Sequence, residues 1–127
     1  MTAYGFMAVG FGAMLGAWLR WALSAWLNAL QPAVPPGTLA ANLIGGYLVG
    51  IAVAYFTSHP SIAPEWRLFA ITGFLGGLTT FSTFSAESVA LLQNARYLAA
   101  LAHCGLHLAG SIVATIAGFA TWRALSA

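Results

Sequence analysis

Side chains able to bind ions gather at three places in a chain that is otherwise apolar. The densest group lies between Thr72 and Ser85, where three glycines lie among threonines, serines and phenylalanines. Asn42 offers an amide with two N–H donors. A third group recurs every four residues, which places its members on one face of a helix: His103, His107, Ser111 and Thr115. No nucleophile is paired with a base and an orienting carboxylate, so these residue types favour ion binding over catalysis.

The segment rich in glycine and hydroxyl groups predicts an interruption in a membrane helix. Such residues weaken a helix, and non-helical backbone inside a membrane is tolerated only where protein buries it or it lines a cavity. An interrupted helix frees carbonyl groups on its first half and N–H groups on its second, which suit a cation and an anion respectively. Phe81 and Phe84 share a face there, and their positive ring edges could contact an anion. The alternative is a continuous helix whose hydroxyls bond their own carbonyls.

Two further features admit a functional and a structural interpretation. His103 and His107 share a helix face and could hold a metal, but no third ligand and no carboxylate accompanies them in the sequence, so we expect no metal site. Glu87 and Arg20 are the only charged residues expected well inside the membrane, where a charge is either functional or paired. Arg20 could instead reach the interface, or bond the carbonyl groups at a helix end.

The composition decides the class of protein. Hydrophobic residues make up 61% of the 127 residues and charged residues only 5%, with no lysine. This composition predicts an all-α integral membrane protein that forms one domain over residues 1–127. Four scattered arginines exclude a nucleic-acid surface. Thr38 could cap the second helix, which follows two prolines. The expected spans are Ala3–Leu30, Thr38–Phe56, Glu65–Gln93 and Tyr97–Trp122.

The arginines give no preferred orientation. Arg67 and Arg123 fall at one side of the membrane, whereas Arg96 and Arg20 fall at the other. An excess of positive charge on the cytoplasmic side normally fixes topology, so this balance predicts insertion in both orientations and an antiparallel homodimer. A tie arising by chance among few arginines is the alternative. Small residues at four-residue spacing predict close helix contacts: Gly12 and Gly16, Gly46 and Gly50, Gly73 and Gly77, and Gly110, Ala114 and Gly118.

Three motifs carry a resemblance to a known family: GAWLRW at 16–21, PGTLAAN at 36–42 and GFLGGLTTFSTFS at 73–85. With the four spans and the charge balance, the chain resembles the Fluc/CrcB family of fluoride channels over essentially its whole length. The resemblance implies an antiparallel, dual-topology homodimer with two fluoride pathways. It also implies a structural sodium ion at the dimer centre, held by backbone carbonyls at the break in the third helix, which correspond here to Gly76 and Thr79.

The same resemblance assigns an ion pathway. Its stacked phenylalanines correspond to Phe81 and Phe84, and its pore asparagine to Asn42. The polar track corresponds to Ser82 and Thr83 on the third span and His107, Ser111 and Thr115 on the fourth, while Arg20 and Glu87 match charged positions. The implied activity is passive export of fluoride across the inner membrane of a prokaryotic cell, which relieves fluoride toxicity. Neutral donors suit this task, because they replace the water around the ion without holding it as a lysine would.

Two other functions remain open from the sequence. A small proton-coupled exporter of cationic drugs also uses four helices and inverted dimers, but it needs an acid facing the substrate cavity, and Glu87 is the only deep acid. An assembly subunit without transport activity would use the glycine faces alone. That alternative leaves Asn42 and the two hydroxyl-rich segments without a purpose.

Overall fold

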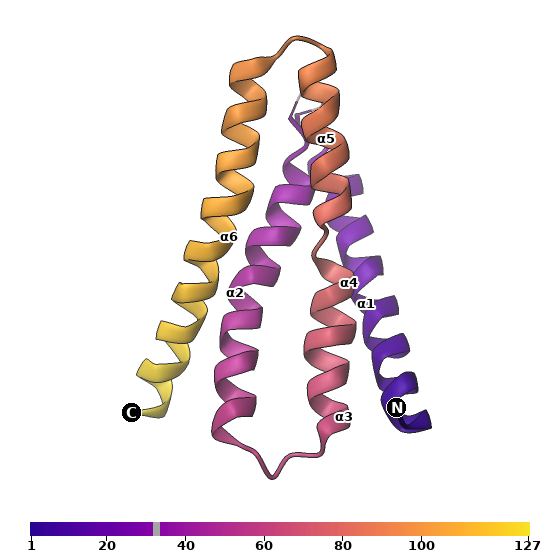
Figure 1. Cartoon of the computed structure of the whole chain (residues 1–127), viewed down its shortest axis with the longest axis vertical. Coiled ribbons are helices and arrows are strands. Elements are labelled where there is room, and N and C mark those ends of the chain that lie inside the picture. Colours follow the sequence, from indigo (N-terminus) through magenta and orange to yellow (C-terminus); the bar gives the residue numbers. More distant parts are fainter. Residues whose placement is uncertain (32–33) are drawn as a thin grey trace.

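The computed structural model describes residues 1–31 and 34–127, and every regular element within them is helical. Four spans are long and apolar enough to cross a membrane, which confirms the predicted number of spans and the all-α class. Both termini lie at the same end of the molecule (Figure 1). The elements are α1 (Ala3–Leu27), α2 (Pro36–Ser58), α3 (Pro64–Arg67), the π-helix η1 (Leu68–Leu75), α4 (Gly76–Leu78), α5 (Phe81–Gln93) and α6 (Tyr97–Ser126).

The boundaries at the first loop differ from the predicted ones. The first helix ends at Leu27 instead of Leu30, and the side-chain oxygen of Asn28 accepts a hydrogen bond of 2.8 Å from the Gly37 N–H. This bond ties the end of α1 to the start of α2. The second helix begins at Pro36, so the prediction that Thr38 caps it was wrong: a proline needs no capped N–H at the first helical position. Pro32 and Ala33 of the predicted loop lie outside the described residues.

Two pairs of helices approach until their backbones touch, as the small-residue spacing predicted. On α1, a Cβ added to Gly16 would collide with the Phe74 carbonyl oxygen of η1. On α2, a Cβ added to Gly50 would collide with the Thr115 carbonyl oxygen of α6. Only glycine permits this distance, and in a membrane the van der Waals contact so gained replaces the missing hydrophobic drive.

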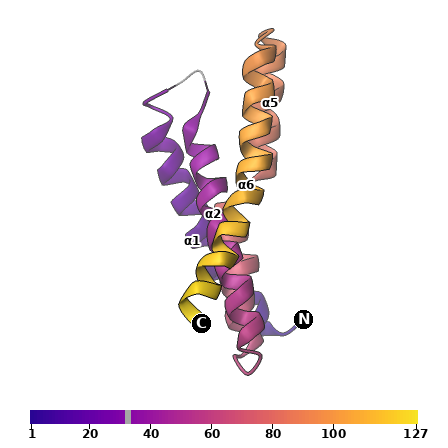
Figure 2. The same ribbon diagram turned by 90° about the vertical axis from the view of Figure 1, so that its left-hand side faces the viewer.

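The third span is not one uniform helix. A π-helical stretch leads into α4, which ends at Leu78, and α5 begins at Phe81. Between them Thr79 and Thr80 have extended backbone, with ψ angles of 154° and 121°. Beyond this point the third span separates from the first two. Figure 2 shows α5 and the first half of α6 leaning away from the end of α1 and the start of α2.

A tight turn lays α6 back along α5. Ala95 has a φ angle of 55°, and the Arg96 N–H donates to the Leu91 carbonyl at 2.9 Å, the pattern that commonly terminates a helix. Because the two helices run antiparallel from this turn, residues equally far from Ala95 lie at similar levels along the pair. Glu87 and His103 are such a pair.

The close contact of α1 with the third span can be tested with two glycines of the same helix. We expect Gly16→Ala to destabilise the protein by about 1–3 kcal/mol, because backbone cannot move aside as a side chain can. Gly10→Ala is the matched control, since nothing lies within 4 Å of its added Cβ. Thermal unfolding of the purified variants in detergent, followed by tryptophan fluorescence, compares the two. Equal melting temperatures for the two variants would contradict the contact.

Candidate functional site at the interrupted third span

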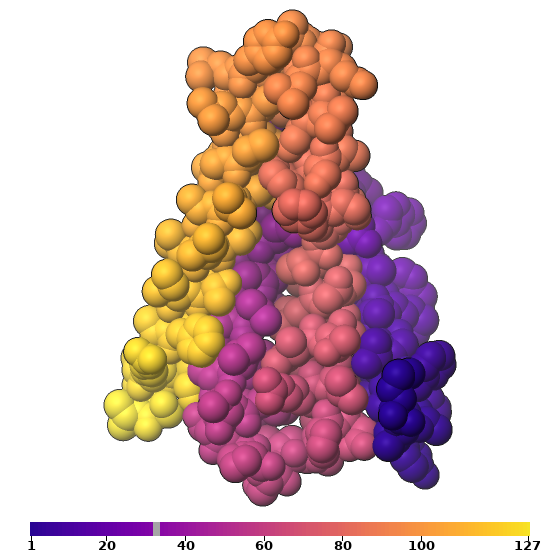
Figure 3. All heavy atoms as spheres, in the orientation of Figure 1, coloured from indigo at the N-terminus to yellow at the C-terminus, as the bar shows by residue number. Residues whose placement is uncertain are grey.

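A groove of about 390 Å³ lies against the interruption in the third span. The surface is hollowed between α6 and the third span, with α2 recessed between them (Figure 3). Among the described residues that line the groove, none is a carboxylate, a lysine or an arginine. The lining residues are Asn42, Gly45, Gly46, Val49, Ile71, Leu75, Gly76, Thr79, Thr80, Phe81, Phe84, His107, Leu108, Ser111 and Ile112.

The amide of Asn42 holds the interrupted backbone at both of its polar groups. Its Oδ1 accepts a hydrogen bond of 2.8 Å from the Thr80 N–H, and its Nδ2 donates to the Thr80 carbonyl at 3.0 Å. The same Nδ2 lies 3.0 Å from Nδ1 of His107 on α6. An amide nitrogen is only a donor, so His107 accepts at Nδ1. Asn42 therefore joins three of the spans at one point.

Two backbone carbonyls lose their ordinary helical partners at the interruption. The Thr80 N–H, which would bond the Gly76 carbonyl in a continuous helix, donates to Asn42 instead. The Thr83 N–H donates to Oγ1 of Thr80 at 3.1 Å, where a continuous helix would direct it to the Thr79 carbonyl. Gly76 is exposed and lines the groove with Thr79. Carbonyl oxygens are ligands for hard cations, so the donor set at these two residues fits the sodium ion that the resemblance implies.

The two predicted phenylalanines form one aromatic wall. The ring centroids of Phe81 and Phe84 are 5.4 Å apart in an edge-to-face arrangement. Phe84 also packs on both histidines, with centroids 5.5 Å from His103 and 4.7 Å from His107. Phe81 lines the groove and is 74% exposed. Their positive ring edges can contact an anion there without supplying a full charge.

The remaining predicted pathway residues divide into two sets. His107 and Ser111 line the groove, whereas Thr115 lies outside its lining and donates to the Gly46 carbonyl at 3.0 Å, which joins α6 to α2. Ser82 and Thr83 also lie outside the groove lining. They surround Thr80, whose hydroxyl caps α5 and lies within 3.2 Å of both of their hydroxyl oxygens.

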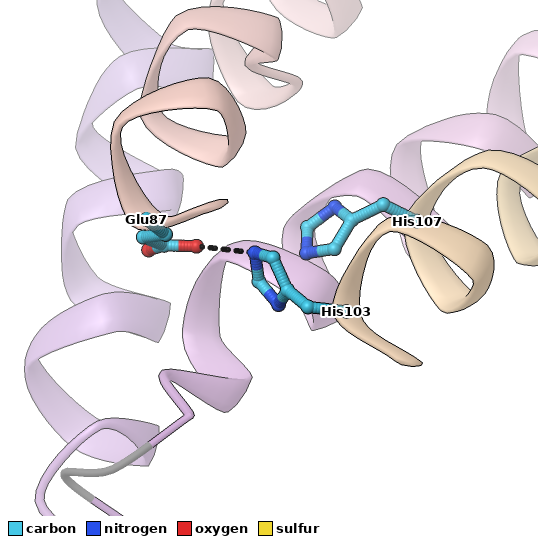
Figure 4. A group of neighbouring side chains, drawn as sticks. All are labelled: Glu87, His103 and His107. Carbon is cyan, nitrogen blue, oxygen red and sulfur yellow. Dashed lines mark ion pairs between the residues drawn. The ribbon is translucent and has the colours of Figure 1, made fainter. Parts of the chain in front are cut away.

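The two deep charges lie apart and have different partners. Arg20 donates from Nε to the Gly77 carbonyl at 3.0 Å, close to the end of α4. Bonding to the carbonyl groups at a helix end was one of the alternatives that the sequence left open for Arg20. Glu87 accepts a hydrogen bond of 2.6 Å from Thr38 at Oε1, and its Oε2 lies 3.2 Å from Nε2 of His103 (Figure 4). The hydroxyl of Thr38, predicted to cap a helix, thus serves this carboxylate.

The expectation that no carboxylate accompanies the two histidines was wrong. The antiparallel packing of α5 on α6 places Glu87 beside them, and ligand atoms of the three residues lie within 4.8 Å of one another. Thr38, Thr80 and His103 are the site residues that sequence reasoning passed over or left without a role. The four-residue spacing from His107 marked His103, and the hydroxyl-rich segment included Thr80, while Thr38 was marked only as a helix cap.

Comparisons with known proteins agree with this architecture. A family model described as CrcB-like protein, Camphor Resistance (CrcB), matches residues 7–119. A protein of Pseudomonas putida (strain W619), named fluoride-specific ion channel FluC, is 62% identical over 94% of both chains. A protein of the same name from Cupriavidus metallidurans (strain CH34) is 58% identical over 99% of this chain and 100% of its own length.

The family match covers most of the chain, and the relatives align with it over nearly their full length. With four apolar helices of membrane-spanning length, the protein is a multi-pass membrane protein, and it belongs to the CrcB family.

Proposed function

We propose that this protein is a fluoride-selective passive channel that exports fluoride from the cell. The observation that carries the proposal is the groove at the interrupted span, which offers neutral donors and ring edges and, among the described residues, no side chain with a permanent charge. Relatives named fluoride-specific ion channels that align over nearly the whole chain support the same activity. An inside-negative potential would then drive fluoride outward through the inner membrane.

The chemistry of the groove suits a small, strongly hydrated anion. Such an ion enters only where donors replace its water, and it leaves only if no single group holds it strongly. The Nδ2 group of Asn42, the hydroxyl of Ser111 and the edges of Phe81 and Phe84 meet both demands. Ser82, Thr83 and Thr115 lie outside the groove lining and would extend the polar path beyond it.

The groove does not favour the drug exporter. A proton-coupled carrier of cationic substrates needs an acid that faces the substrate cavity. Glu87 is absent from the groove lining, is only 14% exposed in its side chain, accepts a hydrogen bond from Thr38 at one oxygen and lies against His103 at the other. A carboxylate so enclosed by Thr38 and His103 is poorly placed to exchange a proton with a substrate.

We further propose that two copies associate in opposite orientations around a sodium ion. Lipid cannot satisfy polar backbone, and Gly76 is exposed with its carbonyl deprived of a helical partner. A second copy would cover this surface, and a cation bound by the carbonyls of Gly76 and Thr79 of both copies would satisfy them. Each copy contributes its own groove, which gives two pathways.

Efflux from liposomes containing the purified protein tests the proposed activity. We expect fast fluoride release only when a potassium ionophore balances the charge, and no chloride release, as measured with ion-selective electrodes. Fluoride release without the ionophore would indicate coupled exchange and contradict a passive channel. Folded protein that releases no fluoride under either condition would exclude fluoride transport altogether.

A pair of phenylalanine variants tests the aromatic wall. We expect Phe81→Ile to lower fluoride flux at least tenfold, because the aliphatic side chain has no positive ring edge. Phe6→Ile on α1 is the matched control, since the two phenylalanines are 74% and 72% exposed but only Phe81 lines the groove. Gel filtration checks that both variants assemble as the wild type does. An equal flux for the two variants would refute the role of Phe81.

Labelling in intact cells tests the two orientations. A single cysteine introduced as Ser61→Cys lies in the exposed loop between α2 and α3, and Cys104→Ala removes the native thiol. We expect a membrane-impermeant maleimide to label roughly half of the copies from outside, because the arginines favour neither orientation. Labelling of nearly all copies, or of almost none until the cells are opened, would mean one orientation and exclude the antiparallel dimer.

A further inference from the structure

We propose that Glu87, His103 and His107 form a binding site for one divalent transition-metal cation of the zinc type, next to the groove. The three side chains converge from α5 and α6 (Figure 4). Within the described residues, three buried side-chain atoms make no hydrogen bond: Oε2 of Glu87, Nε2 of His103 and Nε2 of His107. These are the atoms that would bind a metal. The first two atoms lie 3.2 Å apart but lack the geometry of a hydrogen bond.

Burial makes the unsatisfied atoms significant. The exposed fractions of His103 and His107 are 1% and 4%. A buried polar atom that makes no hydrogen bond destabilises the folded protein. One ligand bound between three such atoms would satisfy all of them. Two imidazoles and one carboxylate form a set that zinc prefers, with a position left over for water.

The surrounding contacts suit such a site. The ligand atoms already lie within 4.8 Å of one another, whereas the ligands of zinc, at about 2.0–2.2 Å from the metal, lie closer together, so side-chain rotations must bring them in. Thr38 donates to Oε1 of Glu87 and leaves Oε2 to the metal. A ligating carboxylate held in this way by a neighbour is typical of metal sites.

The link between Asn42 and His107 connects the site to the groove. His107 lines the groove and also belongs to the cluster. Because Asn42 donates to Nδ1 of His107, the neutral ring carries its proton on Nε2. A metal bound at Nε2 requires that proton to move to Nδ1, which can then no longer accept from Asn42, so metal binding competes with the bond from Asn42. This step rests on the proposed function: in a fluoride channel, bound zinc blocks fluoride flux because it disturbs Asn42, which holds the interrupted backbone at Thr80.

Zinc binding to the purified, chelator-treated protein tests the site without reference to transport. We expect isothermal titration calorimetry to find one zinc ion per chain. We expect His103→Ala and Glu87→Gln to weaken the affinity at least tenfold; the second variant keeps a carbonyl oxygen for Thr38. His59→Ala is the matched control, because His59 is exposed in the loop after α2 and lies outside the cluster. Absence of saturable binding, wild-type affinity in both cluster variants, or loss of binding in the control would overturn the site.

The same proteins in liposomes test the block. We expect zinc to inhibit fluoride efflux in the wild type and in His59→Ala. In a cluster variant that retains flux, at least tenfold more zinc should be needed. Zinc that binds as expected but leaves wild-type flux unchanged would refute the block. Wild-type protein that binds zinc yet passes no fluoride in metal-free buffer would refute the proposed function and leave the metal site standing.

Discussion

The two hydrogen bonds between Asn42 and the backbone of Thr80 are the interaction on which the rest of the structure depends. Backbone that leaves a helix inside a membrane must find other partners, because lipid offers none. One amide supplies both an acceptor and a donor to the same residue, which makes two residues of extended backbone tolerable. Because the Thr80 N–H donates to Asn42, the Gly76 carbonyl loses its helical donor, and Gly76 is exposed at the groove.

Close helix packing brings this amide into place. Asn42 lies on α2, which packs against α6 through Gly50, and the third span is fixed against α1 at Gly16. These contacts leave no room for a methyl group, so backbone meeting backbone fixes α2 against α6 and the third span against α1. A side chain as short as asparagine can then reach Thr80 from one direction and His107 from the other.

The polar interior consists of two systems that share one residue. The first is the groove, in which neutral donors and aromatic edges surround a space open on one side. The second is the enclosed cluster of Glu87, Thr38 and His103, where a carboxylate accepts a hydrogen bond from a hydroxyl and lies 3.2 Å from an imidazole nitrogen. His107 belongs to both, since Nδ1 accepts from Asn42 while Nε2 faces the cluster. This arrangement keeps the carboxylate out of the groove, where its charge would repel an anion.

The sequence by itself determined the class of protein, the number of spans, the small-residue contacts and the segment in which the third span changes, because these depend on composition and local spacing. It also marked Asn42, Phe81, Phe84, His107 and Ser111, which the fold brings to one groove. Only the tertiary structure decided that Thr38 serves Glu87 instead of a helix end and that Glu87 completes a cluster with two histidines. Thr38 and Glu87 are 49 positions apart in the sequence, and Glu87 and His103 are 16 apart. These contacts depend on the turn at Ala95 and on how α2 meets α5, which no local pattern encodes.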